Sequence, residues 1–302
     1  ILGEPFVPRA NAEDRDLRTF FRRRLGAGFA RELLPALVGG VLAAPPEDIG
    51  LDAVPQLRRL DQRGGLALGT LRLGFDRTRL PAGGTGALTR ALAERLGCVR
   101  TGHAAEALEP APDGRWIAHG GGRTECADRV VLALPAHAAQ ALLAPFAPEL
   151  APAFAAIRQL DLKLWHSRHP RIPAWSRGFL LLLHPPEGHG LLGVLSLPFD
   201  DPRCPPGTMQ LRAYLGGAYP IDPALLEWEG LFQELRKWLP ELPPPLQTRL
   251  ERADGAFPLP GPEHGAQVAR ILEGLPVGLH WVGAARWGPA LMMLGIVGAL
   301  LL

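Results

Sequence analysis

Apolar positions in the first third of the chain recur at helical spacing. Between residues 14 and 25 they lie on one stripe, which predicts an amphipathic helix that Gly26 breaks. The stripe consists of Leu17, Phe20, Phe21 and Leu25. A second helix is expected over 29–43, where Pro35 should kink or divide it and two following prolines should stop it.

A third helix is expected after a glycine-rich turn. The segment 80–97 reads LPAGGTGALTRALAERLG, with Thr85 as the expected N-cap and a glycine at the end. Leu88, Leu92 and Leu96 recur four residues apart. One face of this helix is therefore predicted to pack against a core.

Strand patterns dominate the remainder of the chain. Two strands are expected around the DGRW turn within 99–134, and the apolar run RVVLALP at 129–135 predicts a strand buried on both faces of a parallel sheet. Four segments between 158 and 217 predict an antiparallel sheet: LDLKLWH, GFLLLLH, GLLGVLSL and MQLRAYLGG. Two helices, over 223–239 and 263–275, are expected with an extended segment between them.

These elements form two groups, one α/β and one of helices with an antiparallel sheet. The second group interrupts the first in sequence, so the predicted fold class is α/β with an α+β mixture. This order is usual when a substrate domain is inserted into a dinucleotide-binding domain. The expected parts are a helical part of the substrate domain at 1–77, a part of the dinucleotide-binding domain at 78–145, the substrate domain with its antiparallel sheet at 146–275, and the C-terminal part of the dinucleotide-binding domain at 276–302.

Composition narrows the class of protein. The chain has 302 residues, enough for one large domain or two smaller ones, and 47% of them are hydrophobic. The formal net charge is only +2, with no basic stripe, so nucleic-acid binding has little support. Cys98, Cys126 and Cys204 are scattered without metal-ligand spacing. We therefore expect reduced cysteines and a cytoplasmic location.

The two ends of the sequence leave alternatives open. The chain begins with Ile1, without a charged-then-apolar leader, which we interpret as the start of a fragment. The apolar end at 289–302 reads PALMMLGIVGALLL, which is shorter than the roughly 20 residues of a membrane span. The favoured interpretation is that this segment forms a buried terminal helix. The alternative is that it contacts a membrane surface.

Four segments, taken in order, resemble one enzyme family. They are FFRRRLGAGFARELLPALVGGVLAAPPEDI at 20–49, PAGGTGALTRALAERLG at 81–97, ADRVVLALPAHAAQALL at 127–143 and FPLPGPEHGAQVARILEGLPVGLHWVG at 257–283. The chain resembles protoporphyrinogen oxidases, within the superfamily of FAD-dependent amine oxidases and phytoene desaturases. The resemblance covers nearly the whole chain.

The resemblance implies an FAD-dependent oxidoreductase. In this family a bound flavin accepts hydride from a porphyrinogen-like or amine-like small molecule held between two domains, and oxygen or another acceptor reoxidises it. The implied fold is an incomplete FAD-binding Rossmann-like domain with an inserted substrate domain. The positions that match cofactor-binding segments are Gly83, Gly84, Ala105, Ala133, Pro135, Gly283 and Gly288. The resemblance assigns no catalytic residue and no metal ligand, and a homodimer stays open.

The chain departs from the family at its pyrophosphate site. The family's G-x-G-x-x-G loop is missing, and neither GGLALG at 64–69 nor GGTGAL at 83–88 matches it. Met293 stands where an acidic residue is expected. We therefore expect weak FAD binding and little activity from this chain alone. The alternative is a fragment or degenerate flavin-free paralogue that acts as a non-catalytic binding or partner protein.

Two other groups of polar residues could be binding sites. His166 and His169, with a second group at 184–189, could be drawn as a metal site, but the spacing is no zinc signature and favours solvated loop histidines. The run Arg22–Arg24 could attract a carboxylated substrate, although a solvated helix face is the favoured interpretation.

Overall fold

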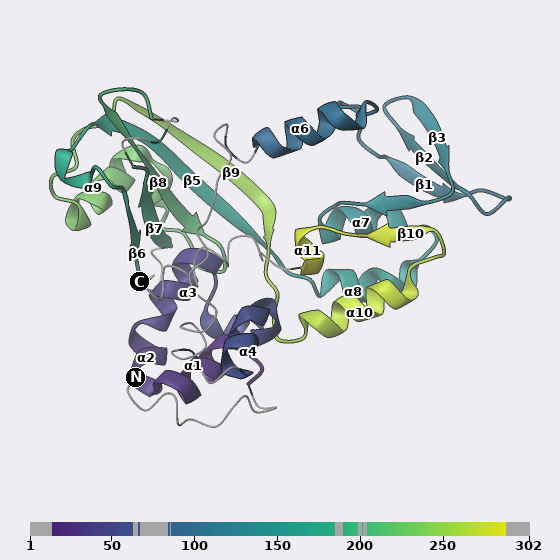
Figure 1. Ribbon diagram of the computed structural model, residues 1–302, viewed down its shortest axis with the longest axis horizontal. Helices are drawn as coiled ribbons and strands as arrows, with labels where there is room; N and C mark the ends of the chain where they lie inside the picture. The colour runs from purple at the N-terminus through teal and green to yellow at the C-terminus, as the bar shows by residue number, and fades with distance from the viewer. Residues whose placement is uncertain are drawn as a thin grey trace. The chain divides into compact units, whose positions relative to one another are not determined.

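A computed structural model describes residues 14–62, 66, 84, 86–184, 190–198, 201 and 204–287 (Figure 1). The chain divides into two compact units. Unit 1 comprises residues 1–74 and 158–262, and unit 2 comprises residues 75–157 and 263–302. Each unit is therefore built from two separate stretches of sequence.

Unit 1 begins with a group of short helices. They are α1 (Leu17–Leu25), α2 (Ala27–Glu32), α3 (Leu34–Leu42) and α4 (Pro55–Gln62). The Asp16 carboxylate caps α1 by accepting from the Thr19 backbone N–H at 2.8 Å, and Phe20 is buried on the predicted stripe. The expected second helix is divided just before Pro35 into α2 and α3, which confirms the effect predicted for that proline.

The arginine run of α1 is not a solvated helix face. Arg24 forms an ion pair with Asp61 of α4, and both side chains are buried. Arg23 Nη2 lies 2.5 Å from an oxygen of Asp14 and 3.7 Å from an oxygen of Asp61. Only Arg22 is exposed. The preferred interpretation of this run was therefore wrong, because a buried guanidinium needs a carboxylate partner and finds one on a neighbouring helix.

The remainder of unit 1 is a five-stranded antiparallel sheet in the order β6-β7-β8-β5-β9 (Figure 1). The strands are β5 (Gln159–Pro170), β6 (Phe179–Leu182), β7 (Leu191–Ser196), β8 (Thr208–Gly216) and β9 (Gln247–Pro258). The four predicted strands are confirmed, and the segment expected to be merely extended forms the fifth, β9. The long β5 lies at the centre of the three-strand region β8-β5-β9.

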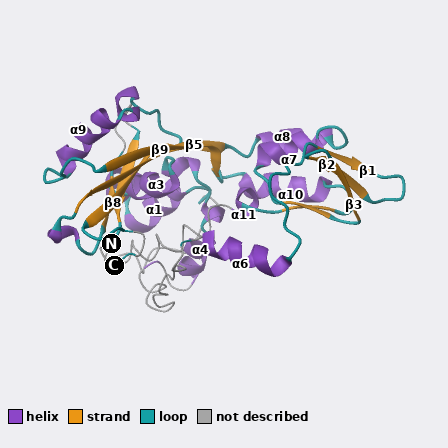
Figure 2. Cartoon of the chain, turned by 90° about the horizontal axis from the view of Figure 1, so that it is seen from above, coloured by secondary structure: helices purple, strands orange, loops and turns teal. Residues whose placement is uncertain are grey.

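Helices pack on both faces of this sheet (Figure 2). On one face, α9 (Trp228–Trp238) buries Leu231 and Leu235 against a cluster that includes Trp165 and Leu211. On the other face, α3 approaches β6 so closely that a Cβ added to Gly40 would lie 2.5 Å from Leu182 Cδ2. Helices therefore cover one face of this sheet and part of the other.

Unit 2 contains two small sheets and five α-helices among its described residues. The strands β1 (Ala107–Pro110), β2 (Trp116–Gly120) and β3 (Arg123–Ala127) form an antiparallel sheet, while β4 (Val130–Leu132) and β10 (Leu279–Trp281) pair in parallel. The helices are α6 (Gly86–Leu96), α7 (Ala136–Leu143), α8 (Ala151–Ala155), α10 (His264–Gly274) and α11 (Ala284–Trp287). One core, which contains Phe154, Ile271 and Trp281, joins β10 to α8 and α10.

The two units divide the chain at other positions than the expected domain boundaries. The expected boundaries fall after residues 145 and 275, whereas the units change at 157/158 and 262/263. Helices α8 and α10 cause the difference, because their apolar residues pack in unit 2. The rings of Phe154 and Trp281, for example, lie 5.2 Å apart.

Two predictions of burial in unit 2 were wrong. Leu88, Leu92 and Leu96 on α6 were expected to face a core, yet they are 60%, 51% and 65% exposed. The strand at β4 was expected to be buried on both faces, yet Val131 is 59% exposed while Leu132 is buried. In both cases the core of unit 2 does not extend over the apolar positions. Thr85, the expected cap of α6, lies outside the described residues.

None of the helices in the described part of the chain could span a membrane. The apolar stretch at 289–302 lies outside the described residues. All three cysteines are free thiols, of which Cys204 is buried and the other two are exposed.

Candidate functional site

The two parallel strands of unit 2 end at a common edge. β4 pairs with β10 in the register Val130↔Leu279 to Leu132↔Trp281, so the residues after both strands lie side by side. The Val282 backbone N–H donates to the Leu132 carbonyl at 3.0 Å and extends the pairing. In open α/β sheets, ligands bind beyond the carboxyl ends of parallel strands. This edge is the candidate site.

Two of the segments matched from sequence meet there. Ala133 and Pro135 follow β4, and Pro135 stands immediately before the first residue of α7. Gly283 follows β10 and precedes α11. Three of the predicted cofactor positions are thus brought together although about 150 residues separate the segments.

Trp281 fixes the turn between β4 and α7. Its indole Nε1–H donates to the Leu134 carbonyl at 3.1 Å, and its ring is fully buried. The Arg286 guanidinium donates to the Trp281 carbonyl at 3.2 Å. A buried indole N–H has to find an acceptor, so this bond both satisfies Trp281 and holds the turn in place.

Gly283 is required by its backbone conformation. Its φ is +118°, in the region that favours glycine, and a Cβ added there would meet no atom within 4 Å. A substitution of Gly283 would therefore strain the backbone, whereas the new side chain would not be crowded by its neighbours. An open glycine at the edge also leaves room for another group to approach the main chain closely.

The other predicted positions are less informative. Gly84 has φ +76° and its carbonyl accepts from the Ala87 N–H at 3.0 Å at the start of α6. Ala105 is exposed on the segment that enters β1 and lies beside Gly120 of β2. In the part of the chain that the structure describes, no hydrogen bond joins either residue to the edge. Gly83 and Gly288 lie outside that part.

The edge is lined by small residues. Ala133 and Pro135 are exposed, and Gly283 leaves open space where a side chain would stand, so a ligand could approach the main chain closely. Arg286 is the cation next to this surface, but its guanidinium also bonds to the Trp281 carbonyl. Among the described residues, no glycine-rich loop at a helix N-terminus stands ready for a pyrophosphate. The described residues of this edge therefore leave room for a ligand and supply no phosphate-binding loop of their own.

The histidines proposed from sequence as a loop group lie on a strand. His166 and His169 both belong to β5. Side chains alternate between the two faces of a sheet, so two residues that are three positions apart lie on opposite faces. His169 is fully buried; its Nδ1–H donates to the Pro243 carbonyl at 2.8 Å, and its Nε2 accepts from Ser167 Oγ at 2.9 Å. Burial lowers the pKa of His169, so the ring is neutral at pH 7.

No group of metal-ligating side chains occurs among the described residues. His184 is exposed at the end of the strand region, and Glu187 and His189 lie outside the described residues. The expectation of solvated loop histidines was wrong for His166 and His169. The strand predicted from LDLKLWH continues four residues further than its apolar pattern indicates, because pairing with β8 and β9 extends it.

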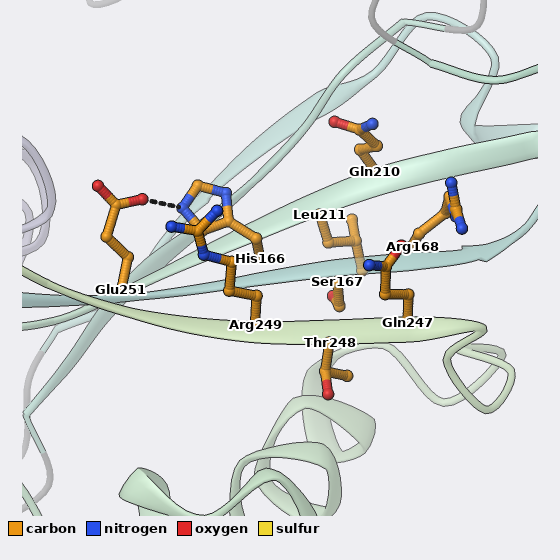
Figure 3. Close-up of a pocket in the computed structure, with 9 residues that line it drawn as sticks. All are labelled: His166, Ser167, Arg168, Gln210, Leu211, Gln247, Thr248, Arg249 and Glu251. Carbon is orange, nitrogen blue, oxygen red and sulfur yellow. Dashed lines mark hydrogen bonds and ion pairs between the residues drawn. The ribbon is translucent and has the colours of Figure 1, made fainter.

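Unit 1 holds a separate polar hollow that sequence reasoning missed (Figure 3). Its volume is about 250 Å³. It is lined by His166, Ser167, Arg168, Gln210, Leu211, Gln247, Thr248, Arg249 and Glu251. Six of these side chains come from alternate positions on three neighbouring strands. The sequence alone does not show that they are neighbours, because this depends on the register of β5 with β8 and β9.

Comparison with known proteins places the fold and the family. The family model for flavin-containing amine oxidoreductase matches residues 8–258. Protoporphyrinogen oxidases of Macaca fascicularis and Homo sapiens are each 26% identical over 243 residues, which are 72% of this chain and 51% of theirs. The chain therefore spans about half the length of these curated relatives.

Solved structures show the same fold. A candidate protoporphyrinogen oxidase from Exiguobacterium sp. 255-15 matches with a TM-score of 0.73 and 21% identity, over 100% of this chain and 70% of its own. Cyclohexylamine oxidase from Brevibacterium oxydans IH-35A matches with a TM-score of 0.61 and 18% identity, over 98% and 68%. With the family model matching most of the sequence, this chain belongs to the flavin-containing amine oxidoreductase family.

Proposed function

We propose that this chain provides the substrate side and part of the cofactor edge of an FAD-dependent oxidoreductase. The observation that carries the proposal is the meeting of Ala133–Pro135 with Gly283 at the carboxyl edge of β4 and β10. Membership of the amine oxidoreductase family supports a flavin as the group that this edge faces. Unit 2 is then the cofactor unit and unit 1 the substrate unit.

The substrate class proposed is a porphyrinogen-like or amine-like small molecule. The names of the relatives support it, since two are protoporphyrinogen oxidases and one structural neighbour is a cyclohexylamine oxidase. When bound, FAD would supply the acceptor for a hydride from the substrate. The family match does not favour the flavin-free alternative. Peripheral membrane contact, homodimer formation and a cytoplasmic location stay predictions.

The residues of this chain would position and shield the ring. Ala133 and Gly283 keep large side chains away from the edge. Trp281 holds the turn after β4 through its bond to the Leu134 carbonyl, so the edge is fixed before a ligand arrives. Such preorganisation lowers the entropy lost on binding. The missing phosphate loop predicts that the affinity for FAD is low despite this fixed edge.

An FAD titration of the purified chain with matched glycine variants tests the proposal. Gly283→Ala and Gly114→Ala both place a side chain at an open position of positive φ, at +118° and +85° respectively. Both should therefore destabilise the protein to a similar extent, by about 1 kcal/mol. Gly114 lies in the hairpin turn between β1 and β2, away from the predicted flavin positions.

We expect the unchanged chain to bind FAD with a Kd above about 1 µM, seen by quenching of flavin fluorescence. Gly283→Ala should weaken this binding roughly tenfold, whereas Gly114→Ala should leave it unchanged. Equal FAD affinities in all three proteins would contradict the assignment of the edge to the flavin. Sub-micromolar binding by the unchanged chain would contradict the predicted weakness of the phosphate side.

A further inference from the structure

The outer face of the sheet in unit 1 carries an ordered array of polar side chains. The register aligns His166 of β5 with Arg212 of β8 on one side and Arg249 of β9 on the other. Two residues along, Arg168 is aligned with Gln210 and Gln247 in the same way. Directly paired residues share a face, so these six side chains and Glu251 occupy one surface of the three-strand region.

This surface is opposite to the apolar core of the same sheet. The intervening residues of β5, Trp165 and Ser167, face the core beneath α9. Figure 3 shows the side chains of His166, Arg168 and Arg249 on the side of the hollow, while Thr248 points the other way. The hollow, of about 250 Å³, is therefore an open-sided recess in a rigid sheet.

The charges in the recess do not balance. His166 Nε2–H donates to Glu251 at 3.1 Å, and His166 Nδ1 accepts from Arg212 at 3.4 Å, so the only glutamate of the array is already engaged. Burial, followed by the charge of Arg212, lowers the pKa of His166 and keeps its ring neutral. Arg168 and Arg249 thus line the recess with Arg212 on the adjoining position of β8, and Glu251 is the one carboxylate among its described lining residues. Like charges on neighbouring side chains repel one another, and a bound anion would reduce that repulsion.

Arg168 has a buried hydrogen-bond donor that lacks an acceptor among the described residues. Its Nε is shielded from solvent and has no hydrogen-bond partner among the described residues. Its neighbours across both strands are glutamines, whose amide N–H groups can also donate to an oxyanion. A guanidinium fork between two amides is a donor set that matches the planar oxygens of a carboxylate or the oxygens of a phosphate.

We propose that this recess binds a small oxyanion, with Arg168 and Arg249 as the charged donors and Gln210 and Gln247 as the neutral ones. The oxyanion is a carboxylate or phosphate group, either free or carried by a small organic molecule. All of the proposed binding residues belong to unit 1. Binding of the oxyanion does not depend on the proposed oxidoreductase function.

Calorimetric titration of the chain with inorganic phosphate and with succinate, in a buffer free of other oxyanions, tests the proposal. We expect saturable binding of at least one probe with a Kd of roughly 10⁻⁵–10⁻³ M. Arg168→Gln should raise that Kd by about tenfold or more, because a charged hydrogen-bond donor is lost. Tighter binding of phosphate would identify a phosphoryl ligand, and tighter binding of succinate a carboxylate-bearing one.

Arg252→Gln is the matched control. Arg252 also lies on β9, and it is exposed. In the strand register it stands opposite Lys163 of β5, so its side chain is on the other face of the sheet. Its substitution should change the Kd by less than about twofold, since it alters net charge but not the recess. If Arg168→Gln impairs folding by circular dichroism, Arg249→Gln carries the same test, because that side chain is exposed.

Two results would overturn the proposal. One is the lack of saturable binding of either probe by the unchanged chain up to about 10 mM. The other is an equal loss of affinity in Arg168→Gln and Arg252→Gln, which would mean that the anion responds to overall charge and not to this recess.

Discussion

The two units bury their apolar surface to different degrees. In unit 1, helix α9 covers one face of the five-stranded sheet and α3 packs on part of the other. Among the described residues of unit 2, the core lies on one side of β4 and β10. Val131 on the other side is exposed, as is the apolar stripe of α6. Parallel strands are normally covered on both faces. The described residues of unit 2 therefore leave apolar positions exposed that a second layer would normally cover.

This difference agrees with the division of labour that we propose. A substrate unit must hold its shape by itself, and the packing of unit 1 is of that kind. A cofactor unit of this family is expected to cover its parallel strands and to hold a phosphate loop, and the described residues of unit 2 do neither.

The largest effect is expected from a cavity in unit 1. Leu231→Ala removes a fully buried side chain of α9 and should lower the free energy of unfolding by about 2–5 kcal/mol. Leu246→Ala, at a position that is 58% exposed, should change it by less than about 0.5 kcal/mol. Hydrogen exchange of the β8 amides measures both. A small effect of Leu231→Ala would remove the contrast between the units.

A smaller, pH-dependent effect is expected at His169. Burial lowers its pKa in the folded state, so the unfolded chain binds the proton more readily. Its contribution to stability is therefore complete above the unfolded pKa of about 6.5 and is lost as the pH falls below it. His169→Asn keeps an amide donor for the Pro243 carbonyl and should flatten this fall in stability. Urea midpoints between pH 5 and pH 8 measure the slope, and an unchanged slope would contradict the role of this ring.

The smallest effect is expected on α6. Leu92→Ser alters an exposed apolar position and should change the stability of the chain by no more than about 0.5 kcal/mol. It should also reduce self-association, measured by light scattering, because an exposed apolar stripe is made smaller. A loss of several kcal/mol would show that α6 is covered and that unit 2 resembles unit 1.

Most of the secondary structure could be predicted because it depends on local patterns. Hydrophobic periodicity predicts the apolar stripe of α1 and the strands β5 to β8. The fixed backbone of proline predicts the break before Pro35. Burial could not be predicted in the same way. Leu92 has the spacing of a core residue, but whether another layer covers it depends on polypeptide elsewhere, which local spacing does not reveal.

The candidate site was predictable only in part. The resemblance located Ala133, Pro135 and Gly283, and the parallel register of β4 and β10 then brought them together. The role of Trp281 was missed, because the sequence shows that a buried indole needs an acceptor but not that the acceptor is Leu134. The recess around Arg168 was missed for a related reason. Its members are far apart in sequence and become neighbours only through the pairing of β5 with β8 and β9.

Hydrogen exchange of the chain, with and without an excess of FAD, tests the central claim most directly. The account predicts slower exchange in the segments 133–139 and 282–286, which form the carboxyl edge of the parallel strands, and unchanged exchange in the hairpin at 110–116. Protection confined to other segments, with the edge unchanged at saturating FAD, would contradict it.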